Sequence, residues 1–253
     1  MSLLKVENLS VAFHTRNGIV KAVDDVSFSV NKGEILGIVG ESGSGKSTIG
    51  RSILKLVNAE SGSVHFDGQE ILGLTQKEFK PVRRRIQMIF QDPYASLNPR
   101  MTVYDALAEP LLYHRIASKA DVEKMVLELM DDVGLARSAI KKYPHEFSGG
   151  QRQRIAIARS IATRPELIIA DEPVSALDVT IQKQVLELLV ELVAKHNLSM
   201  LFVSHDLSVV RSLCDRVMVL QYGKLVETGD TEELWRAPQQ TYTQDLLAAI
   251  PQL

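Results

Sequence analysis

The sequence has 253 residues and one cysteine, Cys214, so it cannot form an intramolecular disulfide bond. This fits a reducing compartment such as the cytosol. No apolar run approaches the roughly 18 residues that a transmembrane helix needs, and residues 1–9 lack the basic and apolar regions of a secretory signal. We therefore expect a protein that reaches a membrane only from the aqueous side, through a partner.

The sequence also lacks an excess of positive charge. It has 29 Lys and Arg residues against 31 Asp and Glu residues, a formal net charge of −2. Proteins whose main task is to bind nucleic acid usually carry a clear basic excess, so we expect no nucleic-acid partner. The one basic cluster, Arg83-Arg84-Arg85, precedes an apolar stretch and is interpreted as a solvated surface run.

Short apolar segments alternate with helical patterns along most of the chain. Strands are predicted at 5–9, 22–30, 34–39, 62–66, 86–90, 167–170, 200–203, 217–220 and 224–228. Turns are predicted at 16–18, at 67–68 and between the last two strands. Helices are predicted over 46–57 and 179–196, and Asp230 is expected to cap a last helix that ends before Pro238.

A helical pattern dominates from Thr102 to about Arg164. Its expected buried face consists of Val122, Met125, Val126, Leu129 and Met130, which recur at helix spacing. Because strands alternate with helices elsewhere, we predict an α/β core with a mostly parallel sheet, antiparallel strands near the N-terminus and an inserted helical lobe. We expect a single domain, 1–253, in which about 92–164 form the helical subdomain and 230–253 a short C-terminal extension.

Residues 40–48 match the phosphate-loop pattern G-x-x-x-x-G-K-[ST], between a predicted strand and a predicted helix. Glycines allow backbone amides to converge on phosphate oxygens, and the helix dipole favours negative charge at the helix start. Lys46 is expected to bind the β- and γ-phosphates and Ser47 to offer its hydroxyl to Mg²⁺. The residues of this loop that we expect to bind the nucleotide are Gly40, Ser42, Gly43, Ser44, Gly45, Lys46, Ser47 and Thr48. Alone, the pattern predicts only a P-loop NTPase, since kinases, GTPases and many motors share it.

Asp171 and Glu172 follow the apolar segment 167–170. Ligands of open α/β sheets bind at the carboxyl ends of the strands. Asp171 is therefore expected to hold Mg²⁺, directly or through water, and Glu172 to orient or deprotonate the attacking water. The alternative interpretation is two solvated carboxylates at a strand end. The presence of the phosphate loop in the same chain favours the catalytic interpretation.

Residues 147–151, Phe-Ser-Gly-Gly-Gln, are followed by a helical segment and indicate a second anion site at a helix N-terminus. They resemble the signature motif of the ABC (ATP-binding cassette) family, with Phe147 in place of the usual leucine. The resemblance implies that Ser148, Gly149, Gly150 and Gln151 contact an ATP molecule held by the phosphate loop of a second chain. An ordinary helix cap is the alternative interpretation.

The resemblance extends from about 3 to 249 and assigns further residues. Gln91 is similar to the glutamine of the Q-loop, which reaches Mg²⁺ or water, and Asp178 ends a segment similar to the D-loop. His205 is similar to the switch histidine that contacts the γ-phosphate. Phe13 is similar to the aromatic residue that stacks on adenine; it could instead be a core residue, and His14 beside it is an alternative stacking partner.

Three segments resemble one group of this family, the oligopeptide, dipeptide and nickel importers. They are 91–103, 175–182 and 242–251, although Gln239-Gln240-Thr241 replaces the expected His-Pro before Tyr242. Some members carry a cysteine cluster near the C-terminus. With Cys214 alone, this chain is more similar to the partner type that lacks the cluster.

Membership in this group implies an ATPase that is peripheral to the cytoplasmic face of the membrane. The implied partners are a second ABC ATPase, identical or different, membrane permease subunits and, indirectly, a solute-binding protein. ATP would be hydrolysed between two closed cassettes, which would then open. The alternatives are an exporter or lipid-transport motor, a regulatory cassette that binds ATP without hydrolysing it, and a soluble ABC machine acting on nucleic acid or the ribosome. Glu172 and His205 argue against the regulatory cassette.

Overall fold

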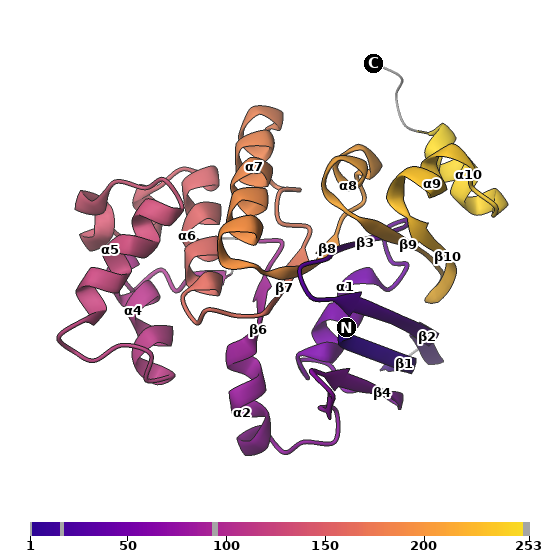
Figure 1. Ribbon diagram of the computed structural model, residues 1–253, viewed down its shortest axis with the longest axis horizontal. Coiled ribbons are helices and arrows are strands. Elements are labelled where there is room, and N and C mark those ends of the chain that lie inside the picture. The colour runs from indigo at the N-terminus through magenta and orange to yellow at the C-terminus, as the bar shows by residue number, and fades with distance from the viewer. Residues whose placement is uncertain (1, 16–17, 93–95, 250–253) are drawn as a thin grey trace. The chain divides into compact units, whose positions relative to one another are not determined.

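The computed structural model describes residues 2–15, 18–92 and 96–249, which are drawn in colour in Figure 1. The chain forms two compact units. The first contains 1–83 and 199–253, and the second contains 84–198. None of the helices in the described ranges combines the length and the hydrophobicity that a membrane span requires.

An antiparallel sheet forms much of the first unit. Its strands are β1 (Ser2–Thr15), β2 (Gly18–Asn31), β4 (Ser61–Phe66) and β5 (Gln69–Glu70), in the order β2-β1-β4-β5. In β1, Leu4, Val6, Leu9 and Val11 are buried. The strands predicted at 5–9, 22–30 and 62–66 are confirmed, and the first two extend further. Of the turn predicted at 16–18, Arg16 and Asn17 lie outside the described residues.

The first unit also contains strands that pair in parallel. Strand β3 (Ile35–Val39) pairs in parallel with both β8 (Ser199–Val203) and β9 (Arg216–Gln221), and β10 (Lys224–Asp230) continues β9 as an antiparallel hairpin. All residues of β3 and β8 are buried, which explains why they are continuous apolar runs rather than alternating ones. Helix α1 (Lys46–Ile53) follows β3, and α8 (Leu207–Leu213) follows β8.

Helix α1 ends at Ile53, so the prediction that it continues to Val57 is wrong. The reason is that Lys55 adopts a left-handed backbone conformation, with φ of 55°. Its ammonium group donates a hydrogen bond of 2.5 Å to the carbonyl oxygen of Leu72 and lies 5.7 Å from the centre of the Phe79 ring. These contacts direct the chain away from the helix axis.

Two helices follow β10. Asp230 caps α9 (Thr231–Arg236) as predicted, because its carboxylate accepts hydrogen bonds from the amides of Glu232 and Glu233 at 3.0 and 3.2 Å. The prediction that this is the last helix is wrong, since α10 (Thr241–Ala248) begins after Pro238. Pro238 therefore separates two helices rather than ending the helical region.

Helix α2 (Gln76–Arg85) contains the boundary between the units and was not predicted. It includes the three arginines interpreted as a surface run. Arg84 is exposed, but Arg85 is half-buried and forms a two-pronged ion pair with Glu166, with distances of 2.5 and 3.0 Å. The pair lies where β6 (Ile86–Ile89) and β7 (Leu167–Asp171) begin their parallel pairing, Ile86 opposite Leu167.

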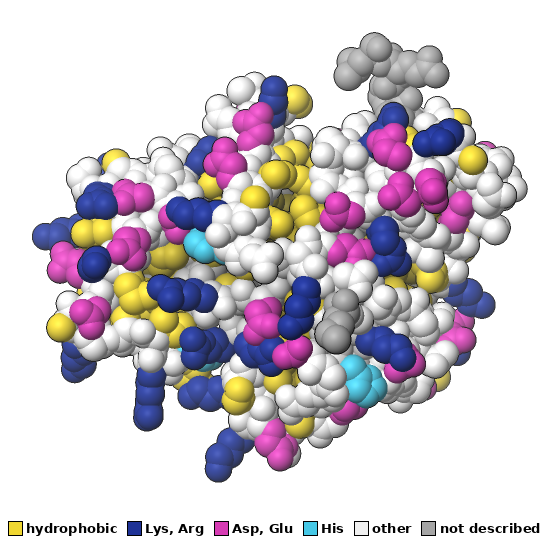
Figure 2. Space-filling view, in the orientation of Figure 1, with side chains coloured by type: hydrophobic (Ala, Val, Ile, Leu, Met, Phe, Trp, Pro, Cys, Tyr) yellow, Lys and Arg dark blue, Asp and Glu magenta, His cyan; other side chains and the backbone are white. Residues whose placement is uncertain are grey.

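The second unit is otherwise mostly helical (Figure 1). It contains α4 (Val103–Tyr113), α5 (Val122–Asp132), α6 (Gly149–Ile161) and α7 (Val179–His196), with short 3-10 helices η1 (Arg137–Lys141) and η2 (Pro144–Glu146). The predicted buried face of α5 is confirmed for Val122, Val126, Leu129 and Met130, and Met125 is half-buried. On the face of the molecule in Figure 2, acidic and basic side chains are interspersed, as the balanced composition indicates.

Candidate functional site

The phosphate loop leaves β3 at Gly40 and enters α1 at Lys46. Gly40 has φ of 145°, and a Cβ atom there would lie 2.1 Å from the carbonyl oxygen of Leu220. Gly45 has φ of 103°, and its Cβ would lie 2.2 Å from the carbonyl oxygen of Ala22. Any other residue would clash with backbone at either position, so the glycines hold the loop tightly against β9 and β2.

The start of α1 differs from that of other helices in its capping. Gly45 occupies the N-cap position and no side chain caps α1 within the described structure, whereas Thr102, Ser148 and Asp178 cap α4, α6 and α7. The first amides of a helix have no partner inside the helix. At α1 no side chain takes the capping role, and the positive end of the helix dipole favours the negative charge of phosphate oxygens.

Lys46 is buried, with 5% of its surface exposed. Its ammonium group donates hydrogen bonds to the carbonyl oxygens of Gly40 and Glu41 at 2.7 and 2.8 Å. Nearby in the loop, the Ser44 hydroxyl is buried without a hydrogen-bond partner among the described residues. A buried unpaired hydroxyl is costly, and a ligand oxygen would remove that cost. The loop thus offers a cation, a buried hydroxyl and a helix start without a side-chain cap, which together suit a phosphate chain.

In the second unit, β7 delivers two carboxylates. Asp171 is its fully buried last residue, and Glu172 follows with a left-handed backbone, φ of 46°. A left-handed conformation at a non-glycine residue is uncommon and often marks a functional site. The Glu172 carboxylate accepts a hydrogen bond of 3.0 Å from the side-chain amide of Gln91, which follows β6. The structure therefore brings together Gln91 and Glu172, which are 81 positions apart.

The signature residues begin α6. The Ser148 hydroxyl accepts a hydrogen bond from the Gln151 amide at 3.3 Å, and the Gln151 side chain accepts one from the Ser148 amide at 3.0 Å. This capping box confirms the ordinary cap as one role of both residues. Gly150 has a packing role as well, because a Cβ atom there would lie 2.4 Å from a methyl group of Ile181 on α7. An ATP contact for these residues stays a prediction.

Three further predicted residues lie at the ends or edges of elements. Asp178 caps α7 by accepting a hydrogen bond of 3.0 Å from the Ile181 amide. His205 is exposed and lies between β8 and Asp206, the capping residue of α8. Phe13 lies on β1 opposite Val20 and is 40% exposed, which argues against a core residue. His14 beside it is also exposed, so either remains available for adenine.

The predicted residues divide between the units. The first unit holds Phe13, residues 40–48 and His205, and the second holds Gln91, Ser148 to Gln151, Asp171, Glu172 and Asp178. One contact of the loop was not predicted. The hydroxyl of Tyr242, on α10, accepts a hydrogen bond of 3.2 Å from the backbone amide of Glu41. The two residues are 201 positions apart, and no local pattern in the sequence signals such a contact.

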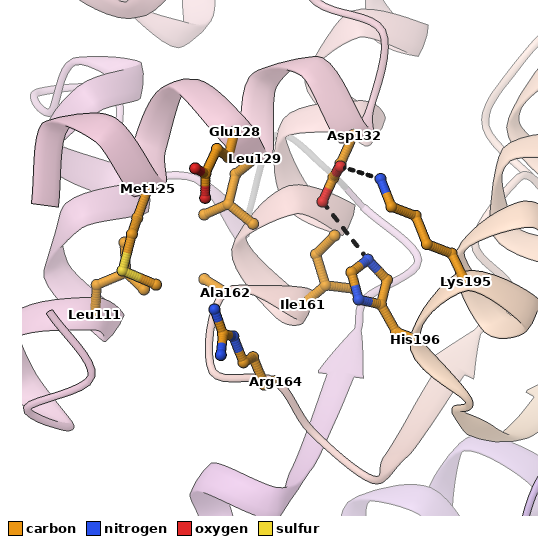
Figure 3. Close-up of a pocket in the computed structure, with 10 residues that line it drawn as sticks. All are labelled: Leu111, Met125, Glu128, Leu129, Asp132, Ile161, Ala162, Arg164, Lys195 and His196. Atoms are coloured by element: carbon orange, nitrogen blue, oxygen red, sulfur yellow. Dashed lines mark hydrogen bonds and ion pairs between the residues drawn. The ribbon is translucent and has the colours of Figure 1, made fainter. Parts of the chain in front are cut away.

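A pocket of about 320 Å³ also lies in the second unit, over α5 and the ends of α6 and α7 (Figure 3). Its wall contains Asp132, which forms an ion pair with Lys195 at 2.6 Å and lies 3.5 Å from the His196 imidazole. The other lining residues include the apolar Met125 and Ile161 and the charged Glu128 and Arg164. None of the predicted site residues lines this pocket, so it is separate from the nucleotide-binding residues of this unit.

Comparison with known proteins places these motifs in one family. The sequence profile of the ABC transporter family matches residues 23–175. The chain is 53% identical to the oligopeptide transport ATP-binding protein OppF of Bacillus subtilis (strain 168), over 98% of this chain and 82% of the relative. It is 50% identical to the OppF protein of Streptococcus mutans serotype c, over 99% of this chain and 82% of the relative.

Solved structures agree. One is a dimeric post-hydrolysis structure of the ATP-binding cassette MJ0796, bound to ADP and Pi. It matches this chain with a TM-score of 0.82 and 30% sequence identity, and the match covers 90% of this chain and 98% of the MJ0796 chain. The cbiO1 protein of Clostridium perfringens, part of the ABC transporter complex cbiONQ, has a TM-score of 0.82 at 27% identity, over 93% and 91% of the two chains. The predicted fold is thereby confirmed, and the chain belongs to the ABC transporter family.

Proposed function

We propose that this chain is the ATP-hydrolysing motor subunit of an ABC importer for peptides or a related small solute. The observation that carries the proposal is the phosphate loop, where the buried Lys46 and the uncapped start of α1 form a site for a phosphate chain. The cargo class comes from the relatives, which are oligopeptide transport ATP-binding proteins and are 53% and 50% identical to this chain over the aligned residues.

Binding of ATP uses groups that the loop already holds in place. The hydrogen bond to the Gly40 carbonyl oxygen positions the Lys46 ammonium group, which has three donors and also donates to phosphate oxygens. The amides at the start of α1 bind the same phosphates, and the buried Ser44 hydroxyl gains a partner. Phe13 or His14 stacks on the adenine.

The donors proposed for Mg²⁺ are the Ser47 hydroxyl, the Asp171 carboxylate and the Gln91 side-chain oxygen. Mg²⁺ binds oxygen ligands, typically one or two carboxylates together with substrate phosphates, rather than an all-protein cage. No cluster of three or more acidic, histidine or cysteine side chains suited to a metal occurs among the described residues, and the donor chemistry fits an ion shared with ATP. When bound, the ion supplies positive charge against the β- and γ-phosphate oxygens.

Hydrolysis depends on Glu172 and His205 in this proposal. The left-handed backbone of Glu172 and the hydrogen bond from Gln91 hold its carboxylate in one orientation, as a residue that directs an attacking water requires. His205 contacts the γ-phosphate. The nucleotide of a second cassette is contacted by the signature residues Ser148, Gly149 and Gly150 and by Asp178.

The remaining partners follow from the relatives. The MJ0796 cassette is dimeric, and cbiO1 is part of a transporter complex, which supports pairing with a second cassette and binding to membrane permeases. The chain would then lie at the cytoplasmic face of the membrane. A solute-binding protein would deliver the cargo to the permeases and would not touch this chain.

The test compares ATP binding and phosphate release in Glu172→Gln, Lys46→Ala and the unmodified chain. Glu172→Gln keeps an oxygen for the Gln91 hydrogen bond but loses the charge, so it should bind ATP and hydrolyse it at least about 100-fold more slowly. Lys46→Ala should lose ATP affinity. Glu187→Gln, on the exposed face of α7, is the matched control and should keep the normal rate.

Absence of ATP binding by the unmodified chain would contradict the proposed function. A normal rate in Glu172→Gln would remove Glu172 from the mechanism while leaving the ATPase intact. In the complete transporter, hydrolysis that peptide-loaded binding protein fails to stimulate would contradict the proposed cargo class.

A further inference from the structure

The peptide unit between Gly40 and Glu41 is held from both of its sides. Its carbonyl oxygen accepts a hydrogen bond from the Lys46 ammonium group at 2.7 Å, and its amide donates one to the Tyr242 hydroxyl at 3.2 Å. The carbonyl and the N–H of a trans peptide lie in one rigid plane and point in opposite directions. The two bonds therefore fix the orientation of this plane, and Tyr242 acts on Lys46 through it.

Other parts of the phosphate loop are supported by backbone. Gly40 lies against Leu220, and the Ser44 carbonyl oxygen accepts a hydrogen bond of 3.0 Å from the Gly223 amide. Between these supports, residues 41–43 are exposed. The Tyr242 hydrogen bond reaches this exposed part of the loop at the backbone amide of Glu41.

Tyr242 is itself held in a defined position. It lies in the first turn of α10, next to Thr243, whose side chain is buried. The Glu227 carboxylate of β10 accepts hydrogen bonds from the amides of Gln239 and Gln240 at 2.8 and 3.2 Å, just before the helix begins. A continuous set of contacts thus runs from β10 through α10 to the phosphate loop, all within the first unit.

We propose that Tyr242 is a positioning residue for nucleotide binding, which holds the Gly40–Glu41 peptide so that Lys46 is ready to receive the β- and γ-phosphates. This rests on the proposed function and adds the C-terminal extension to it. Without the hydroxyl, the exposed part of the loop samples more orientations, and ATP must order it on binding. Once ATP is bound, the phosphates themselves hold Lys46. The affinity therefore changes, and the chemical step does not.

Tyr242→Phe tests this, because it removes the hydroxyl and keeps the aromatic ring. One neutral hydrogen bond corresponds to about a two- to tenfold change in an equilibrium constant, so the KM for ATP should rise by about that factor, with kcat within twofold of normal. The inhibition constant of AMP should not change, since AMP lacks the phosphates that Lys46 binds. Tyr222→Phe is the matched control, because Tyr222 is 80% exposed in the neighbouring β9–β10 turn.

The dissociation constant of Mg²⁺–AMP-PNP, measured by titration calorimetry, gives the same comparison without turnover. An unchanged KM and dissociation constant in Tyr242→Phe, or an equal rise in Tyr222→Phe, would overturn the proposal. A lowered melting temperature with unchanged KM would show that Tyr242 only anchors α10, which also contradicts it. If the unmodified chain binds AMP-PNP but hydrolyses no ATP, the proposed ATPase fails while the calorimetric comparison still decides the role of Tyr242.

Discussion

Gly149 and Gly150 are neighbours in the signature segment, yet an added side chain would meet different surroundings at the two positions. At Gly150, a Cβ atom would lie 2.4 Å from an Ile181 methyl group. At Gly149, the nearest atom would be a Leu177 methyl carbon at 3.5 Å, an ordinary contact. Gly150 thus serves the packing of α6 on α7, whatever it contributes to nucleotide binding.

We therefore expect Gly150→Ala to destabilise the fold by about 1–3 kcal/mol, because Ile181 must move. Gly149→Ala, the matched control, should be neutral or stabilise by up to about 1 kcal/mol, since alanine favours a helix over glycine. Denaturant unfolding followed by circular dichroism measures both. Removing the obstruction with Ile181→Ala in the Gly150→Ala background should give less than the sum of the two single losses, and strict additivity would contradict the steric cause.

The phosphate loop and Asp171-Glu172 could be located from the sequence because each lies at the carboxyl end of a fully buried strand. The local sequence pattern is sufficient to locate these residues. The second role of Gly150 and the Tyr242 contact could not be found in this way. Each depends on a residue from another element, Ile181 for Gly150 and Glu41 for Tyr242, and a local pattern does not report which distant residue packs against a given position.

Among whole elements, α2 and α10 were missed for different reasons. Helix α2 contains Pro81 and few apolar residues, of which Phe79 and Val82 are buried, so its apolar period is weak. Helix α10 follows Pro238, which suggested the end of helical structure. It is fixed by Glu227, a residue of another element. The central strands and α7, with long apolar runs or clear caps, were predicted nearly to their ends.

Glu227 makes the docking of the C-terminal extension sensitive to acid. Burial raises the pKa of its carboxyl group, but the hydrogen-bond donors around it, the amides of Gln239 and Gln240 and the Thr243 side chain, together outweigh this, so that its pKa lies below the ordinary 4.5. A carboxylate with a lowered pKa in the folded state contributes stability above its ordinary pKa. That contribution is lost as the pH falls through the folded-state value.

The start of α10 should therefore loosen as the pH falls below about 4.5. Trp235, the single tryptophan, lies in α9 and reports on this region by its fluorescence. Glu227→Gln should show the acid-type emission already at neutral pH and lose the acid transition. Glu233→Gln, an exposed carboxylate of α9, is the control. An acid transition that persists unchanged in Glu227→Gln would assign it to other groups.

For the whole molecule, the proposed function predicts that two cassettes assemble around ATP. The first unit holds the phosphate loop, and the second holds the signature at the start of α6. In the proposed function each signature serves the ATP of another cassette. A variant that binds ATP without hydrolysing it should therefore trap two chains together.

We expect Glu172→Gln to double its mass in light scattering when ATP is added, and Lys46→Ala to keep the mass of a single chain. Adding Ser148→Arg to Glu172→Gln should prevent the doubling, because a long cation replaces the small hydroxyl at the signature. That change also removes a helix cap.

Thr102→Arg, which removes the same kind of capping box from α4, controls for this loss of a cap. Added to Glu172→Gln, it should leave the doubling of the mass intact. Equal loss of assembly in both double variants would mean that the cap, and not the signature, is responsible. A Glu172→Gln chain that keeps its single mass with ATP would contradict pairing between two copies and point to a different cassette as the partner.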